Sequence, residues 1–198
     1  MITSMFETKI YEAMMPNFNK QATLDKLMPL FDSPSFHINS EGEGKSTYWQ
    51  NDGQLHRHTD ISEITNFVLD HAKIYWKELG YHTPDKIWIS HSWANNTPTN
   101  GWVRNHNHLP CPVVGSFYVN ATPEMGNLII EHPLNSILAY QPWENLSHTE
   151  SYLNTTEIES HSGKLVLFPG YLNHWVHKNT TNENRVGLAF NIMPSWGA

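Results

Sequence analysis

The chain has 198 residues, of which 39% are hydrophobic and eight each are Trp, Tyr and Phe, so it can fill a core and is not wholly disordered. Its net charge of −7, from 12 basic and 19 acidic residues, disfavours phosphate backbones, and we expect no nucleic-acid partner. Its single cysteine, Cys111, excludes an internal disulfide, and no apolar run approaches the roughly 20 residues of a membrane span, so we expect one cytoplasmic domain over residues 1–198 with no membrane contact.

The N-terminal part, residues 1–85, carries the helical signals. Residues 19–31 predict a short helix, and residues 60–79 predict a longer one whose apolar side chains recur at i, i+3 and i+4. Asp60 is the predicted N-cap of the longer helix, and Gly80 stands where a left-handed C-terminal residue belongs. We expect these helices to pack against one side of the remaining chain.

The remainder, residues 86–198, changes to short runs rich in β-branched and aromatic residues, separated by Gly, Pro and Asn. Such runs without intervening helical patterns indicate an antiparallel sandwich, barrel or jelly roll, so the predicted class is mainly β (α+β). The predicted strands are 86–93, 112–121, 126–132, 136–141, 156–161, 163–170, 174–178 and 185–192.

Histidine is the unusual component, with 13 residues against 12 Lys and Arg combined. In His106-Asn107-His108, an extended backbone would project both imidazoles to one face, as two adjacent ligands of one metal require. The alternative is a polar turn with two exposed histidines. Four residues that precede this motif could line the mouth of a substrate pocket, namely Trp93, Asn95, Asn96 and Trp102, and core packing is the alternative for Trp93.

A second segment competes for a metal role. His56, His58 and Asp60 give both a His-x-His and a His-x-Asp spacing, and the latter occurs in facial triads of two histidines and one carboxylate. Asp60 already has a predicted structural role at the helix start, and no predicted strand flanks this segment.

Two further candidates follow the strand at 163–170. His174 comes after a Pro-Gly turn, whereas His177, three residues on, should face away from it. Arg185 opens the last strand on the face that carries the small residues Gly187 and Ala189. A guanidinium beside such space can hold a carboxylate through two hydrogen bonds, although a surface arginine is the simpler interpretation.

In order along the chain these motifs resemble Fe(II)- and 2-oxoglutarate-dependent oxygenases of the double-stranded β-helix (jelly-roll) fold, in particular a group found in phages and bacteria. The resemblance covers about half of the chain, from about Ile89 to Ile192. It rests on Ser92-Trp93-Ala94-Asn95, His106-Asn107-His108, Gly115-Ser116-Phe117-Tyr118, Gly126-Asn127-Leu128, Gly163 to Pro169 with His174, and Arg185 to Asn191.

The resemblance implies that His106, His108 and His174 bind Fe(II), and that Arg185 holds the distal carboxylate of 2-oxoglutarate with Tyr118 donating to the same end. It implies an oxidoreductase that uses O₂ to oxidise, typically hydroxylate, a small-molecule or peptidyl substrate, in the host cytoplasm if the chain is phage-encoded. The chain departs from the family pattern at His108, where an acidic residue is usual, and at Phe117, which replaces a tyrosine.

Two other functions are considered. Gly163 to His174 approaches the second cupin motif, which would indicate a metal enzyme without 2-oxoglutarate, but no Glu follows the His-x-His at cupin spacing. A non-catalytic jelly-roll module would bind neither metal nor cosubstrate.

Overall fold

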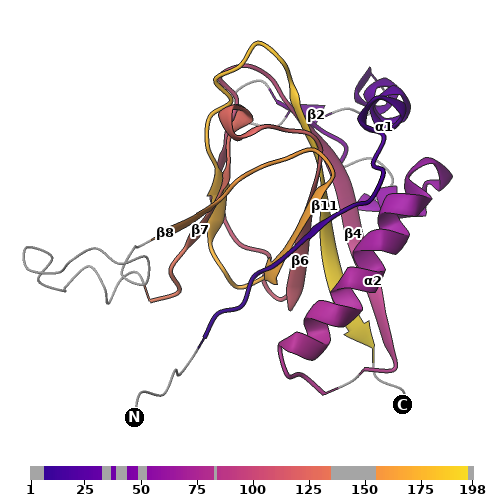
Figure 1. Ribbon diagram of the computed structural model, residues 1–198, viewed down its shortest axis with the longest axis vertical. Coiled ribbons are helices and arrows are strands. Elements are labelled where there is room, and N and C mark those ends of the chain that lie inside the picture. The colour runs from indigo at the N-terminus through magenta and orange to yellow at the C-terminus, as the bar shows by residue number, and fades with distance from the viewer. Residues whose placement is uncertain are drawn as a thin grey trace, which may run out of the picture.

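Two antiparallel sheets form the body of the molecule, and the longer helix lies along the outside of the larger one (Figure 1). The structure is a computed structural model that describes residues 7–32, 37–38, 44–48, 53–82, 84–134 and 155–195. The mainly β prediction is confirmed. The strand predicted over 136–141 lies outside the described residues.

The larger sheet has the order β1-β9-β6-β11-β4-β3-β2, and the smaller sheet has the order β5-β10-β7-β8. The strands of the larger sheet are β1 (Tyr11–Met14), β2 (His37–Ile38), β3 (Lys45–Ser46), β4 (Lys86–Thr97), β6 (Val113–Asn120), β9 (Lys164–Pro169) and β11 (Arg185–Ser195). Those of the smaller sheet are β5 (Val103–His106), β7 (Leu128–Glu131), β8 (Thr155–Ile158) and β10 (His174–Val176).

The two predicted helices are α1 (Lys20–Leu27), which a 3-10 turn over Met28–Asp32 extends, and α2 (Ser62–Glu78). Asn19 caps α1 by accepting a hydrogen bond from the backbone N–H of Ala22 at 3.0 Å. Gly80 ends α2 with φ +74°, as predicted.

The predicted N-cap of α2 is wrong. Asp60 lies inside a 3-10 turn over Thr59–Ile61. The helix α2 begins at the next residue, Ser62, so that Ile61 occupies the N-cap position. The Asp60 carboxylate instead faces the ring of His58, 3.3 Å from its Nδ1. The extra turn carries the chain from the sheet to the helix and displaces the acidic side chain from the cap.

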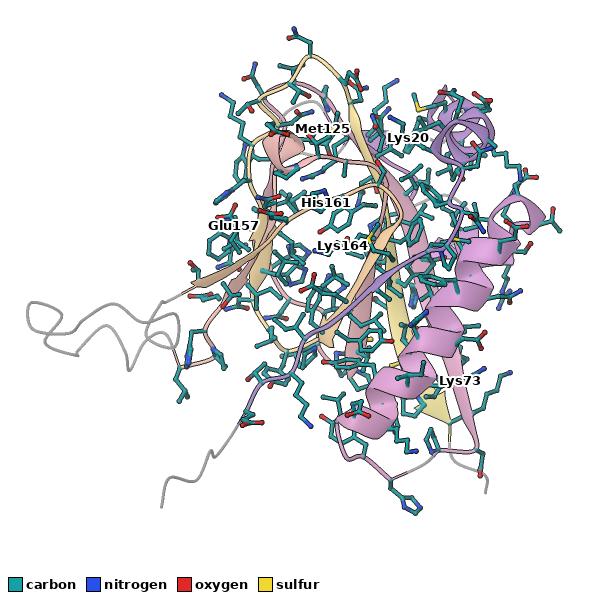
Figure 2. The ribbon with its side chains drawn as sticks, in the orientation of Figure 1. Lys20, Lys73, Met125, Glu157, His161 and Lys164 are labelled. Atoms are coloured by element: carbon teal, nitrogen blue, oxygen red, sulfur yellow. The ribbon has the colours of Figure 1, made fainter. Side chains whose placement is uncertain are left out.

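One hydrophobic core lies between α2 and the larger sheet. This core contains the apolar face of α2 and alternate residues of β11, namely Val186, Leu188, Phe190 and Ile192. Because strand side chains alternate, this packing directs Arg185 and Asn191 to the opposite face, between the two sheets. Figure 2 shows the resulting layers, with Lys73 of α2 on the far side of the molecule from Glu157 of β8.

The N-terminal part also contributes strands, which its hydropathy pattern does not predict. β1 pairs antiparallel with β9 at the edge of the larger sheet, with Tyr11 opposite Leu167, and β3 pairs with β4. Within the described ranges, no helix has the length and hydropathy that a membrane span requires.

Candidate functional site

A cavity of about 640 Å³ lies between the two sheets. Its walls include His106, His108 and His174 at one place and Arg185 and Tyr118 at another. The two stretches of chain that the sequence separates by more than 60 residues therefore meet at one cavity.

Strand pairing brings the three histidines together. His106 ends β5 and His174 begins β10, and these two residues are direct partners in the antiparallel register. His108 follows two residues after His106, and its ring centroid lies 5.0 Å from that of His106 and 5.1 Å from that of His174. One ring nitrogen of each histidine lies within 4.8 Å of one from each of the others.

The outer nitrogen of each ring faces an oxygen acceptor. Nδ1 of His106 lies 2.8 Å from the Arg104 carbonyl oxygen, and Nδ1 of His174 lies 3.0 Å from that of Leu172. Since a carbonyl oxygen only accepts, these Nδ1 atoms carry the proton, which leaves the Nε2 lone pairs free.

His108 is oriented by a residue of another strand. Its Nδ1 lies 2.8 Å from Oδ1 of Asn191 on β11, and its Nε2 lies only 3.2 Å from Nε2 of His106. Two imidazole lone pairs at that separation repel each other unless a cation or a proton lies between them. Neutral ring nitrogens that face one another in this way form a donor set that a metal ion can bind.

Burial keeps two of these rings neutral. It lowers the pKa of His108 to about 4 and that of His174 to about 3, and the neighbouring His106 acts in the same direction. Trp93 stacks on His108, with the ring planes 13° apart and the centroids 5.8 Å apart, so it shields this side of the cluster from water while lining the cavity. Neutral imidazole is the form that binds metals.

A buried cation lies elsewhere along the same cavity. Arg185 is 5% exposed, and its Nη1 donates to the Gly126 carbonyl oxygen at 3.1 Å. Burial lowers its pKa to about 10, which still leaves it charged at neutral pH. Tyr118 is 3% exposed, and among the described residues its hydroxyl forms no hydrogen bond of ideal geometry, with the Ser116 and Ser160 hydroxyls nearby. Burial raises the pKa of this phenol, so it remains a neutral donor.

The other sequence candidates lie apart from this cavity's polar groups. His56 bonds through Nδ1 to Ser92 Oγ at 2.9 Å, and the described residues contain no second cluster with metal-ligand spacing, so the competing segment at 56–60 is not supported. His177 points outward, as predicted, with half of its side chain exposed beside Glu157. Cys111 is buried among apolar residues.

Sequence reasoning did not assign a role to Asn191. Asn191 lies on the same face of β11 as Arg185 and the small residues, and that face lines the cavity. The alternation along the strand could therefore have predicted that Asn191 reaches the site. Of the four residues expected at the cavity mouth, Trp93 and Asn95 line the cavity, whereas Asn96 is buried outside its walls and Trp102 is 45% exposed on the surface.

Fold and site together define a jelly-roll protein with a three-histidine cluster and a buried arginine. The sequence profile of a family described as "Putative 2OG-Fe(II) oxygenase" matches residues 91–191, just over half of the chain. The chain belongs to this family of oxidoreductases, which uses Fe(II) and 2-oxoglutarate. Comparison with curated protein sequences gives no match.

Solved structures share the fold at low sequence identity. The α-ketoglutarate-dependent carbocyclase SnoK from nogalamycin biosynthesis superposes with a TM-score of 0.63 at 12% identity, over 95% of this chain and 80% of its own. A Pseudomonas putida prolyl-4-hydroxylase gives a TM-score of 0.59 at 13% identity, over 96% and 94%. HygX from Streptomyces hygroscopicus, with nickel and 2-oxoglutarate bound, gives 0.56 at 13% identity, over 94% and 83%.

Proposed function

We propose that the protein hydroxylates a C–H bond of a small-molecule or peptidyl substrate, with Fe(II) held by His106, His108 and His174 and 2-oxoglutarate held by Arg185 and Tyr118. The observation that carries this proposal is the convergence of one ring nitrogen from each of three histidines whose Nδ1 atoms are held by oxygen acceptors.

The donor set fits a divalent metal. Ligands at right angles with metal–nitrogen bonds of about 2.1 Å are separated by about 3.0 Å, close to the 3.2 Å between Nε2 of His106 and of His108. Imidazole is a suitable ligand for Fe(II), and three ligands on one side of the metal leave positions for cosubstrate and O₂. Three neutral ligands leave the metal charge to be offset by the dianionic cosubstrate.

The far end of the cavity fits a carboxylate. The guanidinium of Arg185 is buried without an acidic partner among the groups that it contacts, namely the carbonyls of Met125 and Gly126 and the hydroxyl of Thr97. The unsatisfied Tyr118 hydroxyl supplies a second donor beside it. A buried charge and a buried unpaired hydroxyl are both costly, and an anionic ligand that bonds to both would remove that cost.

When bound, Fe(II) and 2-oxoglutarate supply the oxidation of a substrate C–H bond to an alcohol by O₂, while 2-oxoglutarate becomes succinate and CO₂. Arg185 and Tyr118 fix one end of the cosubstrate so that its other end reaches the histidines. Asn191 holds the orientation of the His108 ring, and Trp93 excludes water beside it. Trp93 and Asn95 also line the cavity and would contact the substrate.

The test is an anaerobic titration of the metal-free protein with Fe(II) and then 2-oxoglutarate, followed by the visible charge-transfer absorption of the complex. We expect a 1:1 complex, loss of absorption in His174→Ala, and a 2-oxoglutarate requirement raised at least tenfold in Arg185→Gln. Matched controls are His177→Ala and Arg57→Gln, which remove a histidine outside the cluster and an exposed cation that does not line the cavity. Binding of Fe(II) without any response to 2-oxoglutarate would instead indicate a cupin-type metal enzyme.

A further inference from the structure

Four polar side chains form a hydrogen-bonded network on the outer side of the smaller sheet. Oε2 of Glu131, the last residue of β7, accepts hydrogen bonds from Asn105 Nδ2 at 3.1 Å and from Asn173 Nδ2 at 3.0 Å. Oδ1 of Asn173 in turn accepts from Asn107 Nδ2 at 2.9 Å. A single carboxylate oxygen at the end of β7 therefore connects β5 and the start of β10, the two strands that follow one another on the same side of β7.

Each member of the network is next to a cluster histidine in the chain. Asn105 and Asn107 flank His106, and Asn173 immediately precedes His174. Because adjacent residues of an extended chain point to opposite faces, the amides of Asn105 and Asn173 point away from the imidazoles, whereas Asn107, beyond the end of β5, lies at the rim of the cavity. The network thus acts on the same backbone that carries the histidines.

The backbone alone connects these segments weakly. β5 and β10 pair at only two positions, His174 with His106 and Val176 with Val103, and the register shifts between them. A slip of one residue in such a short pairing would turn an imidazole to the wrong face. On the other side of β10, the Glu131 N–H donates to the Asn173 carbonyl oxygen at 2.8 Å, so Glu131 holds Asn173 through both backbone and side chain.

We infer that Glu131 is a positioning residue that fixes the relative register of the segments carrying His106 and His174, and so pre-organises the metal site. This inference rests on the proposed function, since it assumes that those histidines bind the metal. Glu131 acts from outside the cavity and contacts neither the metal position nor the cosubstrate end. Loss of a group bonded directly to a metal ligand typically lowers metal affinity by about 10- to 100-fold, and we expect the lower end of that range from Glu131, which acts through the neighbouring amides.

The experiment measures Co(II) affinity and the visible Co(II) spectrum at saturation in three variants of the full chain. Glu131→Ala removes the shared acceptor, and we expect about tenfold weaker binding with an altered spectrum. Glu131→Gln keeps a carbonyl oxygen that can accept both amide hydrogens, and we expect affinity within about threefold of wild type. Glu159→Ala removes an exposed carboxylate that lies outside these segments and contacts His161, and it should leave binding unchanged.

The results separate the possible causes. Equal binding by Glu131→Ala and Glu159→Ala would overturn the inference, as would a Glu131→Gln defect as large as that of Glu131→Ala, because charge rather than hydrogen bonding would then be responsible. If Glu131→Ala fails to fold, Asn105→Ala, which removes one of two donors, must still weaken Co(II) binding. Failure of the wild-type protein to bind Co(II), or unchanged binding in His174→Ala, would refute the proposed function itself.

Discussion

The hydroxyl of Tyr118 lowers the folding stability of the unliganded protein. It is buried and forms no hydrogen bond of ideal geometry with a described residue, although the Ser116 and Ser160 hydroxyls lie near it and Ser160 donates instead to the Gly126 carbonyl oxygen. An unpaired buried hydroxyl costs about 1–3 kcal/mol, so folding stability alone does not favour a tyrosine here. Its neighbour Arg185 suggests the compensation, since a carboxylate that binds the guanidinium would also accept from the phenol.

Tyr118→Phe should therefore change stability and cosubstrate binding in opposite directions. We expect the free energy of unfolding of the metal-free protein to rise by about 1 kcal/mol, because the unpaired hydroxyl is gone. We expect 2-oxoglutarate to bind 10- to 100-fold more weakly to the Fe(II) form, because a hydrogen bond to a charged acceptor is lost. Urea unfolding and the charge-transfer titration measure the two effects.

The matched control is Tyr75→Phe in α2. The Tyr75 hydroxyl donates to the Lys9 carbonyl oxygen at 2.7 Å, far from the cavity, so its removal should lower stability and leave 2-oxoglutarate binding unchanged. A loss of stability in Tyr118→Phe would show that the hydroxyl has a partner in the folded protein.

At the same scale, the sequence could predict which residues approach one another but not how they are held. The i, i+2 spacing places His106 and His108 on one side, and alternation along β11 places Arg185 in the cavity. The Asn191–His108 hydrogen bond depends on how two strands distant in sequence are placed relative to each other, which no local pattern encodes.

At the scale of elements, the turn between β6 and β7 shapes the buried end of the cavity. Gly126 ends this turn with φ +102°, and a Cβ there would collide with the His177 carbonyl oxygen. Its own carbonyl oxygen accepts hydrogen bonds from Arg185 and, at 2.7 Å, from the buried hydroxyl of Ser160. Gly126 thus allows the turn to approach the backbone of His177 closely, and its carbonyl oxygen orients the guanidinium of Arg185.

Gly126→Ala should cost much more than the same change at Gly80. Gly80 also has positive φ, but an added Cβ would meet nothing within 4 Å, so only the backbone conformation penalises alanine, by about 1 kcal/mol. At Gly126 the collision adds to this, and we expect a loss of at least about 3 kcal/mol in the free energy of unfolding. Urea unfolding measures both, and equal losses would contradict the close approach.

The affinity for 2-oxoglutarate can be measured on the same two variants, because Gly126 contacts Arg185. Because the turn must move to admit a Cβ, Gly126→Ala should also weaken 2-oxoglutarate binding in whatever fraction folds, whereas Gly80→Ala should bind normally. Normal binding by a folded Gly126→Ala protein would show that the turn does not orient the guanidinium.

The elements that the sequence predicts well are those whose own side chains form a core. α2 and β11 repeat apolar residues at the helical and the strand period, and both lie where expected. β5 reads Val-Arg-Asn-His and β1 reads Tyr-Glu-Ala-Met, and neither alternates clearly. These strands exist because β10 and β9 offer free edges, which is a property of the assembled sheets and not of either segment.

At the scale of the whole molecule, forming the metal-free site makes folding sensitive to acid. His108 and His174 have pKa values lowered to about 4 and about 3, mainly by burial, against 6.5 when unfolded. Between those values the unfolded chain binds more protons than the folded one, so the free energy of unfolding falls as pH falls below 6.5. Each such histidine contributes a slope of up to about 1.4 kcal/mol per pH unit.

His174→Gln isolates one of these contributions in the metal-free protein. Whatever the substitution costs at pH 7.5, it removes one proton-binding group, so the slope of unfolding free energy against pH between 6 and 5 should decrease by up to about 1.4 kcal/mol per unit. Urea unfolding at half-unit pH steps with a chelator present measures the slope. The control is His161→Gln, because His161 is exposed beside Glu159 and its loss leaves the buried cluster intact. If the two variants had equal slopes, burial of a neutral His174 would not be the source of the acid sensitivity.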